Sequence, residues 1–436
     1  MPNPTATAVP VYLPLGFIGA GILGLLLLAS ELWGALPSSV VYVRHNAHLL
    51  VLVHLFTLVW GSGVTLGVLH QMAPVILSAQ LFSVRIGWVT LALFVPGSFF
   101  LALSFRTFWL AGVIAGGVLV VLGALLFMYN IARTLRASDD RSVTSRYLIA
   151  SLVSFIGTLL FGIAMAASLR LGAGYDLIKG LMLSHLFLGG AGWFAGIVIA
   201  VSYRLVPMFL LVHGHEEKFA HRFLAVHYAG VALGVAGSIW GGPGGALLGI
   251  LLILAAVIMW AVDMRGMWQK RNRKPDVWMR QVPISIAFLV VAAFGAVGCG
   301  VWDALGGVVP PRAMLAVGAL FALGFVSTMV LTLLHKIVPF LVWYHRFSGM
   351  VGRGRTPAMK DLVHEGVGKY VFPIYYAAVA LIVVGAAFDW VPLAQYAAIA
   401  LVLACAMLAH DLVWLILPIE QLWARLLGAL RKLPAG

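Results

Sequence analysis

Four histidines lie within one long apolar stretch, HNAHLLVLVHLFTLVWGSGVTLGVLHQMAP, which covers residues 45–74. Lipid is a poor environment for an imidazole, and ionisable groups inside membrane segments are often functional. At about 100° per residue, His48 and His54 differ by about 240° around a helix, and His54 and His70 by about 160°. One helix therefore cannot gather them into a compact site, and a second element must complete any site they form.

His185 is the best partner for His54, because both lie at similar depth in apolar runs and precede glycine-rich segments. Imidazole is a common axial ligand of haem iron. Two imidazoles on facing helices predict a bound haem b, with His48 as an alternative or second ligand. Arg44 and His45 would lie at the outer mouth, where they could pair with haem propionates. The alternative is a buried histidine that bonds a carbonyl or hydroxyl group.

A second set of histidines is expected near the inner face, where copper or another transition metal would suit imidazole. Its members are His70, His335, His345, His410 and His227. The alternative is that these side chains reach water or phosphate at the membrane surface. The polar loop HGHEEKFAH at 213–221 is expected to be solvated rather than a metal site. Cys299 and Cys405 form no thiolate metal motif.

The composition defines the elements that position these residues. Hydrophobic residues make up 62% of the 436-residue chain, charged residues 10%, and the mean hydropathy is +1.04. About 20 apolar residues cross the hydrocarbon core as a helix. Numbered in chain order, twelve such spans are expected in an all-α polytopic membrane protein, near 12–34, 46–76, 85–105, 108–132, 147–170, 181–211, 223–241, 244–263, 281–302, 313–343, 370–388 and 391–416.

The net charge of +14 is distributed asymmetrically. With the N-terminus inside, all but five of the 28 Lys and Arg residues lie on the cytoplasmic side; the five are Arg44, Arg106, Arg170, Lys179 and Arg312. This asymmetry follows the positive-inside rule. The charge therefore predicts a multi-pass protein of the cell membrane with both termini cytoplasmic, in contact with lipid and not with nucleic acid.

A repeat connects spans two, six and ten, which are longer than the others. They end on LHQMAP, SYRLVP and LHKIVP, so that His70, Tyr203 and His335 are equivalent and a proline follows each four residues later. The four-span period predicts one transmembrane domain of three pseudo-symmetric four-helix units, near 12–132, 147–263 and 281–416. The carboxylates fall near span ends, so no chain of mid-membrane carboxylates for proton pumping is expected. No span is expected to be broken, as spans are in many secondary transporters.

These features resemble the catalytic subunit of the heme-copper oxidases, most closely its C-type branch and the nitric oxide reductases. In that family span two supplies a His to the low-spin haem, and His54 matches it by its spacing to Pro74. Span six supplies a His to the copper or non-haem iron. SHLFLGGAGWFAGIVIAVSYRLVP is similar, with His185 offset by two residues. Span ten of the family reads HxHSGALGW, and VGALFALGFVSTMVLTLLHKIVP keeps the ALG, the aromatic and the VP.

The chain departs from the family at two places. Val317 and Ala319 occupy the two His positions of span ten, and the outer end of span seven, VAGSIWGGP, carries no His. The resemblance therefore implies an oxidase-like scaffold that holds one haem b without the usual binuclear centre. No C-x-x-C-H motif is present, so a haem would be non-covalent or on a partner.

Three functions remain open at this point. The first is a haem-binding protein of redox, nitric oxide or oxygen metabolism, with a quinol or a cytochrome subunit as electron partner and a possible oxidoreductase activity. The second is a transporter or assembly factor that handles copper or haem. The third is an active terminal oxidase or nitric oxide reductase. The sequence assigns no catalytic residue.

Overall fold

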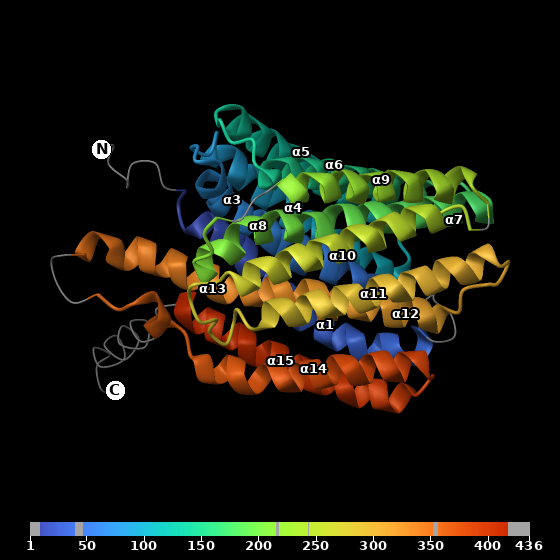
Figure 1. Ribbon diagram of the computed structural model, residues 1–436. Coiled ribbons are helices and arrows are strands. Elements are labelled where there is room, and N and C mark those ends of the chain that lie inside the picture. Colours follow the sequence, from blue (N-terminus) through green and yellow to red (C-terminus); the bar gives the residue numbers. More distant parts are fainter. Residues whose placement is uncertain (1–8, 40–46, 215–217, 243, 352–355, 417–436) are drawn as a thin grey trace, which may run out of the picture.

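A computed structural model describes residues 9–39, 47–214, 218–242, 244–351 and 356–416. Within these ranges the chain is helical and contains no strand. Twelve helices are long and apolar enough to cross a membrane, and Figure 1 shows them running side by side along one axis. The predicted all-α polytopic membrane protein is confirmed.

The spans match the sequence expectation, although several helices run beyond the apolar core. Span six begins at Tyr175, and span ten continues to Met350.

The first four spans are α1 (Tyr12–Ser39); α2 (Ala47–His54), η2 (Leu55–Gly63) and α3 (Val64–Leu77); α4 (Val84–Ser104) with η3 (Phe105–Thr107); and α5 (Leu110–Arg136). The next four are α6 (Val143–Arg170); α7 (Tyr175–Leu186), η4 (Phe187–Ala195) and α8 (Gly196–Leu210); α9 (Lys218–Trp240); and α10 (Leu247–Gln269). The last four are α11 (Gln281–Ala304); α12 (Pro311–Ala319), η5 (Leu320–Ser327), α13 (Thr328–Phe347) and η6 (Ser348–Met350); α14 (Glu365–Ala387), after the short η7 (Met359–Leu362); and α15 (Val391–Ile416).

The outer surface of the bundle is apolar. Large hydrophobic side chains such as Val153, Val262 and Leu403 are exposed along the helices. In water such a surface would drive association, whereas lipid tails solvate it. Exposed Trp240 and Trp390 lie at helix ends, where amphipathic rings suit the headgroup region. The surface is therefore that of a protein surrounded by lipid.

The helix contacts follow a four-span period. In each unit the first span packs along the long second span, and the third and fourth spans pair with each other, as α4 with α5, α9 with α10 and α14 with α15. The fourth span of each unit then packs against the first span of the next: α5 against α6, α10 against α11, and α15 against α1. These contacts close the three units into a ring.

The three long spans share a feature that the sequence analysis did not anticipate. Each contains a π-helical segment in its middle, η2, η4 or η5, eight or nine residues long, and each segment ends 11 or 12 residues before the repeated proline. The spans remain continuous, as expected, but are locally wider than an α-helix. Such widening is rare and is found often at functional sites.

Two hydrogen bonds join the π-helical segments at the centre of the bundle. The Trp60 indole N–H donates to the Ser327 hydroxyl at 3.1 Å, and Trp193 donates to Ser62 at 2.9 Å. The tryptophans occupy one repeat position, 14 residues before the proline, and the serines another. At the same positions the third pairing would join Phe325 and Ala195, which offer neither donor nor acceptor. All of these side chains are buried.

We expect Trp193→Phe to destabilise the protein by about 1 kcal/mol, because the buried Ser62 hydroxyl loses its donor. The double variant W193F/S62A recreates the natural Phe325 and Ala195 combination, and it should recover part of the loss. Thermal unfolding in detergent micelles measures both. Trp240→Phe, at an exposed position, is the control. A double variant less stable than W193F would contradict the assignment.

Candidate functional site

His54 is the last residue of α2, directly before the π-helical segment of span two. Its Nδ1–H donates to the carbonyl oxygen of Leu50 at 2.8 Å. The imidazole stacks on the Phe105 ring of η3, with 4.6 Å between ring centroids. A side chain that is bonded at one nitrogen and stacked on a ring has a fixed orientation, which a ligand requires.

His185 lies at the matching place in span six, in the last turn of α7 before the π-helical segment η4. Its Nδ1–H donates to the carbonyl oxygen of Thr158 in α6 at 2.8 Å. Gly162, one turn further along α6, faces the ring: a Cβ there would lie 3.1 Å from Cε1 of His185. Because Gly162 has no side chain, the His185 imidazole can lie directly against α6.

The two imidazoles belong to neighbouring units, His54 to unit one and His185 to unit two. They are close enough to interact electrostatically. Each uses Nδ1 as the donor to a backbone carbonyl, which leaves the lone pair on Nε2. The described residues form no hydrogen bond to either Nε2. Metal-bound histidines typically show this arrangement, with the second ring nitrogen donating to a carbonyl or carboxylate.

The bundle is more loosely packed around this pair than deeper in the membrane. In span six, residues 185–191 are partly or fully exposed, whereas residues 192–203 are buried. A Cβ built on Gly190 would approach Phe321, at 4.0 Å, and a Cβ built on Gly318 would meet no atom of another described element within 4 Å. Of the glycines in these segments, Gly190 and Gly318 are therefore loosely packed, whereas others such as Gly61, Gly192 and Gly324 are in close contact with neighbouring helices.

His48 has a different role from the pair. Its Nδ1–H donates to Glu31 Oε2 at 2.8 Å, and the Arg106 guanidinium bonds the other oxygen of the same carboxylate. Glu31 is buried, while His48 and Arg106 are partly exposed. His48 is thus engaged in an ionic cluster that ties α1, α2 and η3 together. Arg44 and His45, the expected partners of propionates, lie outside the described residues.

The inner set of histidines does not gather at one place. His70 is buried between Phe17 and Phe127, whereas His335 is buried against Trp278. His345 and His410 are exposed. His227 is bonded within unit two, with Nε2 donating to the Ala191 carbonyl at 3.0 Å. Among the described residues, no group of three or more His, Cys, Asp or Glu side chains is arranged to hold a metal ion.

At the two span-ten positions where the resemblance implies histidines, the chain carries apolar side chains. A Cβ built on Gly295 of α11 would lie 2.7 Å from Cγ2 of Val317, so Val317 fills space against α11. Ala319 is partly buried at the end of α12. Neither side chain has an atom that can ligate a metal.

Several parts of the site were missed by the sequence reasoning. Thr158 contributes its backbone carbonyl. Every residue has such a carbonyl, so the residue type does not show which one accepts a hydrogen bond. Phe105 lies at the end of span three, where an aromatic residue is ordinary. Gly162 gave a weak signal, as a glycine within an apolar span. Phe105 lies far from Thr158 and Gly162 in the sequence, and only helix packing brings these residues to the histidines.

No protein-family model matches the chain, and no curated protein matches its sequence.

We expect Arg106→Ala to destabilise the protein by about 2 kcal/mol, because the buried Glu31 carboxylate loses its cation. Partial exposure of Arg106 keeps the effect below that of a fully buried pair. The double variant E31Q/R106A should regain stability relative to R106A in thermal unfolding. Arg170→Ala, an exposed arginine at a helix end, is the control. Equal stability of R106A and the wild-type protein would show that Glu31 does not depend on this partner.

Proposed function

We propose that the chain is a haem-binding integral membrane protein, similar to the catalytic subunit of the heme-copper oxidases, in which His54 and His185 are the two axial ligands of one haem b. The observation that carries the proposal is their shared geometry. Two histidines from different units lie near each other, each holds its Nδ1–H on a backbone carbonyl, and each keeps Nε2 available.

The surrounding residues would perform separate tasks in such a site. The Leu50 and Thr158 carbonyls fix the tautomer of the rings and increase the electron density at Nε2. Phe105 holds the plane of the His54 ring, and Gly162 allows His185 to lie against α6. The loosely packed Gly190 and Gly318 would leave space for a flat macrocycle.

A haem with two imidazole ligands supplies one-electron transfer. The proposal therefore favours a redox role, connected with nitric oxide or oxygen metabolism by the family resemblance, with a quinol or a cytochrome subunit as electron partner. Val317 and Ala319 cannot ligate a second haem, and oxygen or nitric oxide reduction by the family's binuclear centre has no ligand set here. We define the basic end of the bundle as the end at which all but five of the Lys and Arg residues are expected to lie. We further propose that this end faces the cytoplasm and that the protein resides in the cell membrane.

Copper handling is a second candidate, because two imidazole nitrogens without other partners also suit copper. The described residues add no third His, Cys, Asp or Glu to the pair. A structural pair of histidines would explain the fixed rings but not two free Nε2 atoms in one loosely packed region. Metal content distinguishes the haem and copper alternatives directly.

The test is a reduced-minus-oxidised visible spectrum of the purified protein, with a pyridine hemochrome assay and analysis for iron and copper. We expect low-spin b-type bands and about one iron per chain, the stoichiometry of a single site with two axial ligands. His54→Ala and His185→Ala should each lose these bands. Gly162→Leu retains both histidines but displaces the His185 ring, and it should lose them as well.

His410→Ala is the matched control, because it removes an exposed histidine of the same bundle. Its spectrum should equal that of the wild-type protein. A folded protein without iron would refute the haem assignment, and copper in place of iron would favour the second candidate. Bands that survive in both H54A and H185A would place the haem elsewhere.

A further inference from the structure

The repeat position four residues before the proline has a different environment in each unit. A proline leaves the carbonyl of this residue without its usual helical hydrogen bond, and the side chains here are His70, Tyr203 and His335, all buried. His70 is enclosed by Phe17 and Phe127. The Tyr203 hydroxyl donates to Asp263 at 2.5 Å. At this position of the described repeats, His335 of unit three is the one imidazole that faces a carboxylate.

His335 is held in a fixed orientation. Its Nδ1–H donates to the Leu331 carbonyl at 2.7 Å, and the ring stacks on Trp278 with 3.9 Å between centroids. Its Nε2 lies 3.7 Å from Oδ2 of Asp411 in α15, near the Leu408 carbonyl. That distance exceeds a hydrogen bond, so the two atoms are neighbours without being bonded.

Asp411 connects this buried imidazole to the surface. The carboxylate is 4% exposed, yet its Oδ1 accepts a hydrogen bond of 2.8 Å from Nδ1 of His364, whose side chain is 69% exposed. His364 precedes α14, at the basic end of the bundle. One side of Asp411 therefore meets a solvent-facing imidazole and the other side meets a buried one.

The region around the pair contains several buried polar atoms without a hydrogen-bond partner in the described structure. They are Nε2 of His335, Oδ2 of Asp411, Nε1 of Trp278 and Oγ1 of Thr332. Unpaired buried polar groups are costly, and proteins commonly satisfy them with ordered water. Their occurrence together indicates a place for water and for exchange of a proton.

We propose that Asp411 and His335 form a proton-binding site that is loaded from the basic end of the bundle through His364. A proton from water binds His364, passes to the carboxylate of Asp411, and reaches Nε2 of His335. Only O–H and N–H bonds form and break. Before uptake the pair carries one negative charge in a low-dielectric interior, and after uptake it is a neutral combination of carboxylate and imidazolium. Burial favours the neutral form of the pair.

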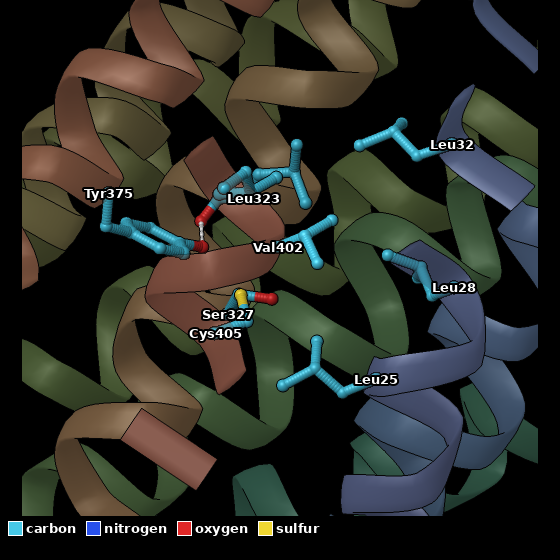
Figure 2. Close-up of a pocket in the computed structure, with 9 residues that line it drawn as sticks. Leu25, Leu28, Leu32, Leu323, Ser327, Tyr375, Val402 and Cys405 are labelled. Atoms are coloured by element: carbon cyan, nitrogen blue, oxygen red, sulfur yellow. Dashed lines mark hydrogen bonds between the residues drawn. The ribbon is translucent and has the colours of Figure 1, made fainter. Parts of the chain in front are cut away.

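The spans that carry His335 and Asp411 also line a small cavity, which lies between unit three and α1 of unit one. The cavity has room for about one water molecule, and Figure 2 shows Ser327, Cys405 and Tyr375 around it, with the Tyr375 hydroxyl donating to the Leu323 carbonyl. Ser327 and His335 lie on one span, and Cys405 and Asp411 lie on another. A proton held at His335 would therefore lie on the same span as Ser327, whose hydroxyl lines the cavity and accepts the hydrogen bond from Trp60.

The other charged groups near the pair have partners of their own. Lys336, the neighbour of His335 on α13, is paired with Asp276 in the segment before α11. From α14 the facing group is His364, and from α15 it is Asp411. Among these charged groups, Asp411 is thus the one that faces His335. The inference does not require a bound haem.

The experiment is deuterium exchange at the imidazole C2 position of the full-length protein in lipid nanodiscs, read by mass spectrometry as a function of pH. This exchange requires both protonation of the ring and contact with water. We expect His335 to exchange with a sigmoidal pH dependence and about tenfold or more faster than the equally buried His70. Asp411→Asn should slow exchange at His335 by about tenfold, because an adjacent carboxylate favours the charged imidazole.

Asp263→Asn is the matched control, since it removes the buried carboxylate at the equivalent place in unit two. It should leave exchange at His335 unchanged. Exchange at His335 as slow as at His70 would overturn the proposal, and the wild-type protein alone decides this point if D411N does not fold. Unaltered exchange in a folded D411N variant would also overturn it.

Discussion

The close approach of the three long spans at the centre of the bundle is the constraint on which the rest of the structure depends. In lipid, helices gain little from the hydrophobic effect and associate through packing and hydrogen bonds. Trp60 and Trp193 each donate across a unit boundary to a serine, and the third position is apolar on both sides. These contacts set the relative depth of spans two, six and ten.

That depth determines where the histidines lie. His54 and His185 each occupy the last turn of an α-helix before a π-helical segment, in units one and two. The wide π-helical turns change the direction of the side chains that follow, so the helical angles of an ideal α-helix no longer apply across the segment. The proposed ligand pair therefore draws one histidine from each of two spans, whereas the histidines within span two diverge.

The three units also show how one scaffold position acquires different chemistry. Four residues before the repeated proline, His70 meets aromatic rings, Tyr203 meets Asp263, and His335 meets Asp411 and Trp278. The backbone is repeated, while the partners come from the other helices of each unit. The side chain therefore defines which group is available, and the neighbouring helices define whether it is enclosed, bonded or able to exchange a proton.

The sequence by itself determined the twelve spans and the repeat, because hydropathy over a span and the spacing to Pro74, Pro207 and Pro339 are local properties of the chain. It also indicated His54 and His185 as a pair, from their similar depth. Tertiary structure alone decided that Thr158 and Gly162 hold His185, that His70 is enclosed by aromatic rings, and that Asp411 faces His335. These contacts join residues on different helices, and helix rotation and packing, which no single segment encodes, set which side chains meet.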